Sequence, residues 1–233
     1  MIKAVFFDWF NTLARFEPPR QELYSRAFRQ FGIELPPKAV MQGIFTADRY
    51  YFEENSKSPV EKRSPEEQTK VYLHYPNAIL TEAGVKALQD IPLKIIKIVL
   101  SQFKGVTFVL FDDVLSTLKT LKEQSFILGL LTNLAQNVVP IYRSLGLEPY
   151  LDFVVSSGEV GVDKPAPRFF YAAMERAGVK ASEAVHVGDQ YKLDVVGARG
   201  VGITPILIDR YDLYPEVSDC PRIQSLSQLA EYL

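Results

Sequence analysis

Four polar side chains of this sequence could perform chemistry together: two carboxylates, a hydroxyl and an ammonium. They belong to Asp8, Thr132, Lys164 and Asp189. The set suits phosphoryl transfer, because one carboxylate can attack phosphorus and form an aspartyl-phosphate. Both carboxylates suit Mg²⁺, which prefers a few carboxylates together with waters and a phosphate oxygen. The hydroxyl and neighbouring backbone amides can hold the non-bridging phosphate oxygens, while the ammonium neutralises the charge that develops on them.

The elements that must position these side chains are strands of a parallel sheet. Three of the four residues are preceded by apolar runs, at residues 2–7, 126–131 and 184–187. The first run shows no alternation, which predicts a strand buried on both faces. Lys164 lies in a glycine-rich loop, residues 158–165, that leads into a helix. Ligands of open parallel sheets bind beyond the carboxyl ends of the strands, so we expect these side chains to surround one point. Alone, Asp8 could equally begin a turn.

The second half of the sequence alternates predicted strands with predicted helices. Further strands are expected at residues 153–155 and 203–208, and helices at residues 113–123, 135–145, 167–177, 192–199 and 225–233. Asn133 could cap the second of these helices, and Asp113 is expected to cap the first rather than to bind a metal with Asp112. His186, inside a predicted strand, is expected to be a core histidine with its hydrogen bonds satisfied. The alternation predicts an α/β protein with helices on both faces of a parallel sheet.

The segment between the first strand and the rest of the sheet breaks this alternation. Leu23, Ala27, Phe28 and Phe31 share one helical face, and Gly32 is expected to end that helix. Further helices are expected at residues 39–54, 66–75 and 81–103, and no strand is predicted between them. We therefore predict an inserted all-helical cap domain of residues 16–107. The catalytic core would comprise residues 1–15 and 108–233.

Four short motifs, each at a predicted strand end or in a loop, occur in a fixed order along the chain. They are Asp8-Trp9-Phe10-Asn11-Thr12-Leu13, Leu131-Thr132-Asn133, Lys164-Pro165 and Gly188-Asp189-Gln190-Tyr191-Lys192-Leu193-Asp194. Together they resemble the ordered motifs of the haloacid dehalogenase superfamily, in its phosphatase-like branch. The match spans residues 1–15 and about 105–210. The resemblance implies a Rossmann-like core with a helical cap that closes over the site.

The resemblance also implies roles for individual residues. Asp8 would be the nucleophile, and Mg²⁺ would be held by Asp8, Asp189 and the backbone carbonyl of Phe10. Thr132 and Lys164 would bind phosphate. Asn133 resembles a family position near the phosphate, although a helix cap accounts for it equally well. Asp194 would support the metal site through water or loop hydrogen bonds, or else be a first-turn acid of the helix that follows.

Position 10 departs from the phosphatase pattern. Typical phosphatases of this superfamily carry there an aspartate that protonates the leaving oxygen and later activates water. Phe10 can do neither, and such acid/base catalysis is typically worth about 10²–10⁴-fold. We therefore expect a Mg²⁺-dependent hydrolase of phosphate monoesters, favouring aryl or acyl phosphates, whose substrate is a small phosphorylated metabolite.

Two alternatives remain open. A 2-haloacid dehalogenase of this superfamily has an aromatic residue two positions after the nucleophile, but it lacks an aspartate equivalent to Asp189 and uses no metal. The absence of a carboxylate at Phe10 would also suit a catalytically impaired relative that binds a phosphorylated ligand. Two facing carboxylates without a metal would be costly in such a protein.

Composition limits the other classes of function. The net charge of −2 favours neither a nucleic acid nor an anionic membrane as partner. The single cysteine, Cys220, excludes an internal disulfide and fits a reducing compartment. Asp8 interrupts the first apolar run too early for a signal peptide, so the expected location is the cytoplasm. The sequence does not indicate an oligomeric state.

Overall fold

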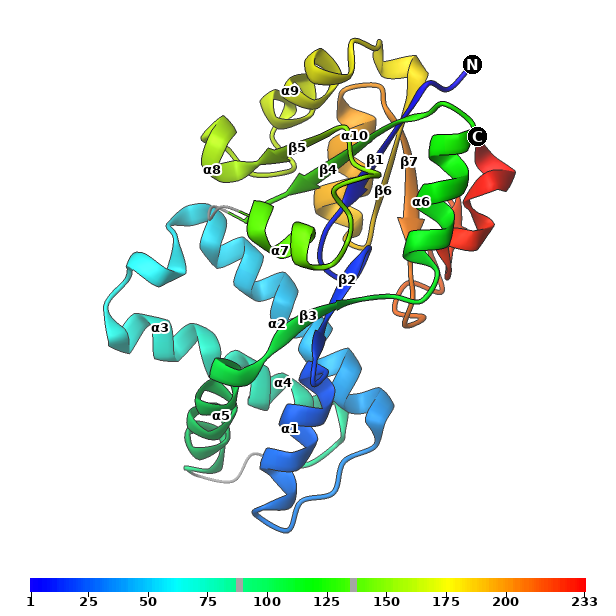
Figure 1. The fold of residues 1–233 in the computed structure, drawn as a ribbon. Coiled ribbons are helices and arrows are strands. Elements are labelled where there is room, and N and C mark those ends of the chain that lie inside the picture. The colour runs from blue at the N-terminus through cyan, green and yellow to red at the C-terminus, as the bar shows by residue number, and fades with distance from the viewer. Residues whose placement is uncertain (87–89, 135–137) are drawn as a thin grey trace. The chain divides into compact units, whose positions relative to one another are not determined.

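The computed structural model describes residues 1–86, 90–134 and 138–233. It divides into two compact units, each described below by itself. The core unit comprises Met1–Arg15 and Phe108–Leu233, and the helical unit comprises Phe16–Thr107. The chain passes between the units in β2 (Ala14–Glu17) and β3 (Thr107–Leu110), which pair in a two-stranded sheet (Figure 1).

The core unit is built on a six-stranded sheet with the order β5-β4-β1-β6-β7-β8. Its strands are β1 (Ala4–Asp8), β4 (Ile127–Thr132), β5 (Phe153–Ser156), β6 (Ala184–Gly188), β7 (Thr204–Ile208) and β8 (Arg222–Ile223). Neighbouring strands pair in parallel. The expected α/β fold with a Rossmann-like parallel sheet is therefore confirmed.

The central strand β1 is buried throughout, which explains its unbroken apolar sequence. Val5 and Phe7 point into one hydrophobic cluster of the core unit, whereas Ala4 and Phe6 point into another. Successive side chains of a strand face opposite sides of the sheet, so both faces of β1 are covered.

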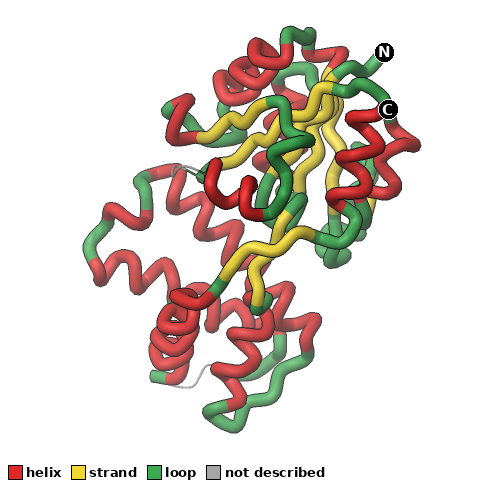
Figure 2. Tube along the Cα trace, in the orientation of Figure 1, coloured by secondary structure: helices red, strands yellow, loops and turns green. Residues whose placement is uncertain are grey.

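Helices cover the two faces of this sheet (Figures 1 and 2). They are α6 (Val114–Glu123), α7 (Val139–Ser144), α8 (Ser157–Val160), α9 (Pro167–Ala177), α10 (Val196–Gly200) and the 3₁₀ helix η5 (Leu226–Tyr232). α6 and η5 contribute leucines to the cluster that contains Val5, and α9 contributes Phe169 and Phe170 to the other cluster. Gly146 and Gly178, just past α7 and α9, have positive φ, as expected of residues that end helices.

Three local predictions for the core unit were wrong. The helix expected at residues 192–199 is a π-helical turn, η4 (Tyr191–Val195), followed by the short α10. The helix expected at residues 135–145 begins at Val139 with Val138 as its N-cap, so Asn133 does not cap it; residues 135–137 lie outside the described part of the chain. Within the described residues the Asp113 side chain makes no capping bond to α6. Its carboxylate instead accepts hydrogen bonds from Arg210 and from the Leu226 backbone N–H.

The helical unit has a hydrophobic core of its own. Its elements are α1 (Arg20–Arg29), α2 (Pro37–Lys57), η1 (Val60–Lys62), α3 (Pro65–Tyr72), α4 (His74–Glu82), α5 (Ile91–Gln102) and η2 (Phe103–Gly105). The helix predicted at residues 66–75 is divided at Leu73 between α3 and α4. The single helix predicted at residues 81–103 was also wrong, since α4 ends at Glu82 and α5 begins at Ile91; residues 87–89 are outside the described part.

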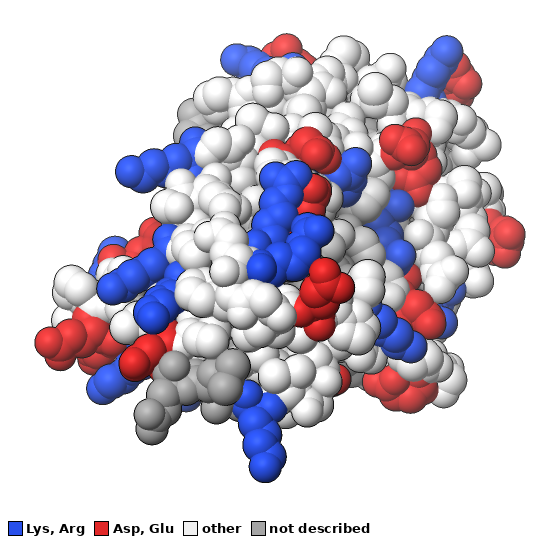
Figure 3. All heavy atoms as spheres, turned by 90° about the horizontal axis from the view of Figure 1, so that it is seen from below, with Lys and Arg blue, Asp and Glu red and all other residues white. Residues whose placement is uncertain are grey.

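The chain carries nearly equal numbers of basic and acidic side chains, 26 Lys and Arg against 28 Asp and Glu. Basic and acidic side chains are interspersed on the face drawn in Figure 3. Among the helices that the structure describes, none is long and apolar enough to cross a bilayer.

Candidate active site

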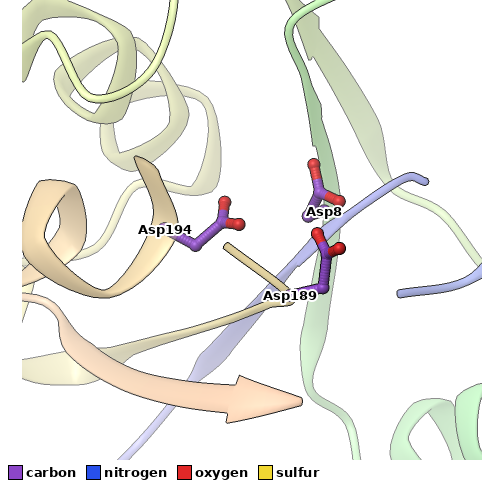
Figure 4. Close-up of side chains that lie close together, drawn as sticks. All are labelled: Asp8, Asp189 and Asp194. Carbon is purple, nitrogen blue, oxygen red and sulfur yellow. The ribbon is translucent and has the colours of Figure 1, made fainter. Parts of the chain in front are cut away.

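The carboxyl ends of three neighbouring strands meet at the candidate site. Asp8 is the last residue of β1, Thr132 the last of β4, and Asp189 directly follows β6. β1 lies between the other two strands in the sheet. The carboxyl groups of Asp8, Asp189 and Asp194 face one another (Figure 4), and one oxygen of each lies within 4.8 Å of the others. The parallel register thus brings together residues that are far apart in the sequence.

Lys164 is the buried cation of this cluster. Its Nζ donates hydrogen bonds to Asp8 Oδ1 at 2.6 Å and to Asp194 Oδ1 at 2.7 Å. Burial alone would lower the pKa of Lys164, but the charges of Asp194 and Asp8 raise it above its ordinary value. The ammonium is therefore charged in the folded protein, beside the carboxylate that the sequence predicts to be the nucleophile.

Asp194 links Lys164 to the end of β6 and to the loop that follows it. Besides Lys164, it accepts hydrogen bonds from His186 Nε2 at 2.9 Å and from the Gln190 backbone N–H at 3.0 Å. Burial opposes its charge, yet Lys164 and His186 lower the pKa of Asp194. A Cβ at Gly188 would lie 2.2 Å from Asp194 Cγ, so only glycine fits at the end of β6.

His186 is a buried histidine of β6, but its hydrogen bonds are only half satisfied. Nε2 binds Asp194, whereas Nδ1 has no hydrogen-bond partner among the described residues. The expectation of a fully satisfied core histidine was thus wrong. Sequence reasoning missed its link to Asp194, since only the bend of the chain at η4 brings the two side chains together.

Asp189 is the electrostatically least satisfied group of the site. Its Oδ2 accepts a hydrogen bond from Asn11 Nδ2 at 3.1 Å, but its buried Oδ1 has no partner in the described structure. Burial and the neighbouring carboxylates of Asp8 and Asp194 raise the pKa of Asp189 well above its ordinary value. Burial likewise raises the pKa of Asp8. Two crowded carboxylates, one with an orphaned oxygen, are the donor set that a hard cation such as Mg²⁺ prefers.

Phe10 lies in the turn that follows β1. Its backbone forms a bridge with Ala14, and its half-buried ring packs against the core unit, perpendicular to Phe108 at 6.3 Å between centroids. The turn needs a left-handed residue, and Asn11 provides it with φ of 60°. Sequence reasoning missed Asn11 as a partner of Asp189, although an asparagine in a turn of this kind is a common choice.

Thr132 and Asn133 lie at the end of β4. Thr132 Oγ1 accepts a hydrogen bond from the Leu134 N–H at 3.2 Å. The Asn133 amide binds the Lys164 backbone twice, accepting from its N–H at 2.8 Å and donating to its carbonyl at 3.1 Å. Ser157 Oγ donates to the Asn133 carbonyl at 2.9 Å. Asn133 therefore ties the end of β4, where Thr132 lies, to the loop that carries Lys164.

Comparisons with known proteins agree with this geometry. A family model described as haloacid dehalogenase-like hydrolase matches residues 2–202. Haloacid dehalogenase-like hydrolase domain-containing protein 3 of Danio rerio is 30% identical, covering 98% of this chain and 95% of that protein. A glyceraldehyde 3-phosphate phosphatase of Methanopyrus kandleri is 39% identical over 47% of this chain and 48% of its own length.

A solved structure is also similar over the full length. A 2-haloacid dehalogenase from Pseudomonas syringae pv. Tomato DC3000 is 30% identical, with a TM-score of 0.57, covering 99% of this chain and 97% of that one. The family model covers most of the chain, including every residue of the site described above. The protein therefore belongs to the haloacid dehalogenase-like hydrolases.

Proposed function

We propose that this hydrolase is a Mg²⁺-dependent phosphatase of small phosphorylated metabolites, with Asp8 as its nucleophile. The observation that carries the proposal is the buried Asp8 carboxylate at the end of β1, with Lys164 Nζ at 2.6 Å and Asp189 beside it. The phosphatase of Methanopyrus kandleri supports the same reaction class.

The reaction would proceed in two steps at Asp8. One Asp8 oxygen attacks the substrate phosphorus, and the bond from phosphorus to the leaving oxygen breaks with its electron pair. Water then attacks the phosphorus of the aspartyl-phosphate and loses a proton to solvent, the bond from phosphorus to Asp8 breaks, and phosphate leaves with the carboxylate restored. Lys164 offsets the charge on the phosphoryl oxygens, and Thr132 binds one of them. Asn133, next to Thr132, binds the Lys164 backbone and so keeps these two residues close together.

The donor set suits Mg²⁺, because Asp189 Oδ1 is buried and has no hydrogen-bond partner in the part of the chain that the structure describes. Asp8, Asp189 and the backbone carbonyl of Phe10 would hold it, and Asp194 would support them from behind. When bound, the cation supplies positive charge that screens an anionic nucleophile from an anionic substrate.

Phe10 determines which substrates react fast. It has no proton to give to the leaving oxygen and cannot take one from water. Aryl and acyl phosphates, whose leaving groups depart without protonation, should therefore be favoured over alkyl phosphates. The loss corresponds to about 10²–10⁴-fold in rate for substrates that need an acid.

A 2-haloacid dehalogenase is the second candidate, because the Pseudomonas syringae enzyme is 30% identical over nearly the whole chain. In that reaction Asp8 would attack carbon and displace halide. Asp189 argues against it, since a metal-free site would leave this carboxylate uncompensated beside Asp8.

The test measures phosphate release from an aryl and an alkyl phosphate, with Mg²⁺ or with a chelator, for wild type, Asp8→Asn and Phe10→Asp. We expect metal-dependent release from the aryl ester by wild type and none by Asp8→Asn. Phe10→Asp should gain most on the alkyl ester, by up to about 10²–10⁴-fold.

Other results would contradict the proposal. Halide release from a 2-chloro acid that persists in chelator would identify a dehalogenase. Wild type and Phe10→Asp proteins that both bind phosphate but hydrolyse neither ester would indicate a ligand-binding relative.

A further inference from the structure

Arg210, two residues past the end of β7, makes contacts that the proposed reaction does not use. It is almost fully buried, with 8% of its side chain exposed. Its Nη2 and Nε donate to the Thr12 carbonyl oxygen at 2.8 and 3.2 Å. Its Nη1 and Nη2 also donate to the two carboxylate oxygens of Asp113 at 2.9 and 3.0 Å. The Phe111 ring lies against the guanidinium, with its centroid 3.9 Å from Cζ.

The Thr12 carbonyl belongs to the turn of residues 9–14, which follows β1 and contacts both Asp8 and Asp189. In this turn Thr12 Oγ1 donates to Asp8 Oδ2 at 3.3 Å, and the adjacent Asn11 binds Asp189. The turn is closed from within by the N–H groups of Leu13 and Ala14, both bonded to the Trp9 carbonyl. Arg210 therefore binds the turn from outside, one residue from the group that contacts Asp189.

Asp113, the second partner of Arg210, is itself bound to the start of η5. Asp113 Oδ2 also accepts from Ser225 Oγ at 2.6 Å and from the Leu226 N–H at 2.8 Å. Burial opposes its charge, but Arg210 and Ser225 lower the pKa of Asp113. Charge-assisted bidentate pairs of this kind are among the stronger hydrogen-bonded contacts. The Arg210 side chain, which binds the turn, is therefore itself fixed in place by Asp113.

We infer that Arg210 is a positioning residue, which holds the turn after Asp8 in register with Asp189 through the Thr12 carbonyl. Only the planar fork of arginine can bind a carbonyl and a carboxylate at once while stacking on Phe111. Its effect on rate rests on the proposed phosphatase function, whereas its effect on the turn does not.

The experiment compares Arg210→Gln with Arg222→Gln. Arg222 is a matched control, because it binds buried Asp209, the neighbour of Arg210, with Nη2 at 2.8 Å and Nε at 2.9 Å. Arg222 lies in β8, and the partners that the described structure gives for its side chain are Asp209 and Asp212, not residues of the turn. The first readout is acrylamide quenching of Trp9, the one tryptophan of the chain, which lies inside the turn and is 1% exposed. The second is kcat and KM for an aryl phosphate with Mg²⁺.

We expect Arg210→Gln to increase the quenching of Trp9 and to lower kcat by about 10–100-fold, with KM little changed. Arg222→Gln should leave quenching and kcat close to those of wild type. Unchanged quenching in a folded Arg210→Gln protein, or an equal kcat loss in both variants, would overturn the inference. If wild type hydrolyses no phosphate ester, the proposed function fails and the quenching comparison still tests Arg210.

Two further variants keep the inference testable if Arg210→Gln does not fold. Arg210→Lys keeps the positive charge but not the planar guanidinium. Its kcat should lie below that of wild type, and its Trp9 quenching should lie above that of wild type, with both effects smaller than those expected for Arg210→Gln. Asp113→Asn should weaken the hydrogen bonds to the Arg210 guanidinium and so increase the quenching of Trp9. Wild-type behaviour of both folded variants would overturn the inference.

Discussion

At the scale of single residues, the site places the buried carboxylates of Asp8 and Asp194 and the half-buried carboxylate of Asp189 around one lysine. Lys164 bonds to Asp8 and Asp194, and it lowers the pKa of Asp194. The Lys164 charge opposes the shift at Asp189 only weakly, because burial and the carboxylates of Asp8 and Asp194 outweigh it and raise the pKa of Asp189 well above the ordinary value. The charge imbalance is therefore concentrated on the side of Asp189, where a cation would be bound.

The side chain at Phe10 leads to a kinetic prediction for wild type. An aryl leaving group needs no proton, so formation of the aspartyl-phosphate should be fast. Its hydrolysis needs an activated water, which Phe10 cannot supply, so this second step should be slower. We expect a burst of phenolate in stopped-flow measurements, about equal to the enzyme concentration, and a phosphoryl group on Asp8 in quenched samples by mass spectrometry.

Two variants serve as controls for this burst. Phe10→Leu preserves an apolar side chain without adding a carboxylate, and it should show the burst. Phe10→Asp should abolish the burst by accelerating the second step. Linear phenolate release by wild type from the first turnover would contradict the prediction.

At the scale of elements, one close approach of two helices dominates the helical unit. A Cβ at Gly43 of α2 would lie 2.4 Å from Ile79 Cα of α4. Glycine in mid-helix costs about 0.5–1 kcal/mol relative to alanine. The absence of a side chain there lets the two backbones pack closely, which explains why the helix tolerates this residue.

Gly43→Ala should therefore destabilise the helical unit by about 1–3 kcal/mol, because the added methyl overpacks the contact. Urea unfolding followed by far-ultraviolet circular dichroism measures the loss. Gly105→Ala is the matched control, since a Cβ there meets nothing within 4 Å, and its stability should be little changed. Equal stability of the two variants would show that α2 and α4 do not pack at this distance.

An irregular element also positions the site in the core unit. The π-helical turn η4 follows Gln190 and places the buried Asp194 carboxylate against Gly188 and His186. π-helical turns recur at functional sites, because they shift one side chain relative to a regular helix. Here the shifted residue is the one that anchors Lys164.

At the scale of the whole molecule, the chain has two compact units with separate hydrophobic cores. Such proteins commonly depart from two-state unfolding. All the proposed metal ligands lie in the core unit, which also contains Trp9. Ligand that binds only the folded state stabilises it by about 2.7 kcal/mol at 100 times Kd.

We therefore expect Mg²⁺ to shift the urea transition of Trp9 fluorescence to higher denaturant, and to shift the transition of the helical unit less. Hydrogen exchange of peptides from β1 and β6, compared with peptides from α2 and α4, measures the two responses. Identical shifts for both sets of peptides would contradict independent unfolding of the units.

Asp189→Asn is the control for this experiment. The pKa of Asp189 is raised in the folded protein, so its contribution to stability falls as pH rises above the unfolded value of about 3.9. At neutral pH the metal-free variant should thus be more stable than metal-free wild type. It should also lose the stabilisation by Mg²⁺.

Local patterns in the sequence were sufficient to predict the parallel sheet and the strands that carry Asp8 and Thr132. An apolar run buried on both faces is recognisable without its neighbours. α9 was predicted with its observed bounds because Pro167 lies in its first turn and Gly178 follows its end. Helix boundaries in the helical unit were less predictable, because α3, α4 and α5 depend on packing against one another rather than on their own periodicity.

The sequence by itself determined which groups could form the site, since residues at the carboxyl ends of adjacent parallel strands must share one edge of the sheet. Only the tertiary structure decided how those groups pair. The bond from His186 to Asp194, the orphaned oxygen of Asp189 and the grip of Arg210 on Thr12 depend on the paths of loops. Arg210 and Thr12 are 198 residues apart, and no local pattern records a contact over that separation.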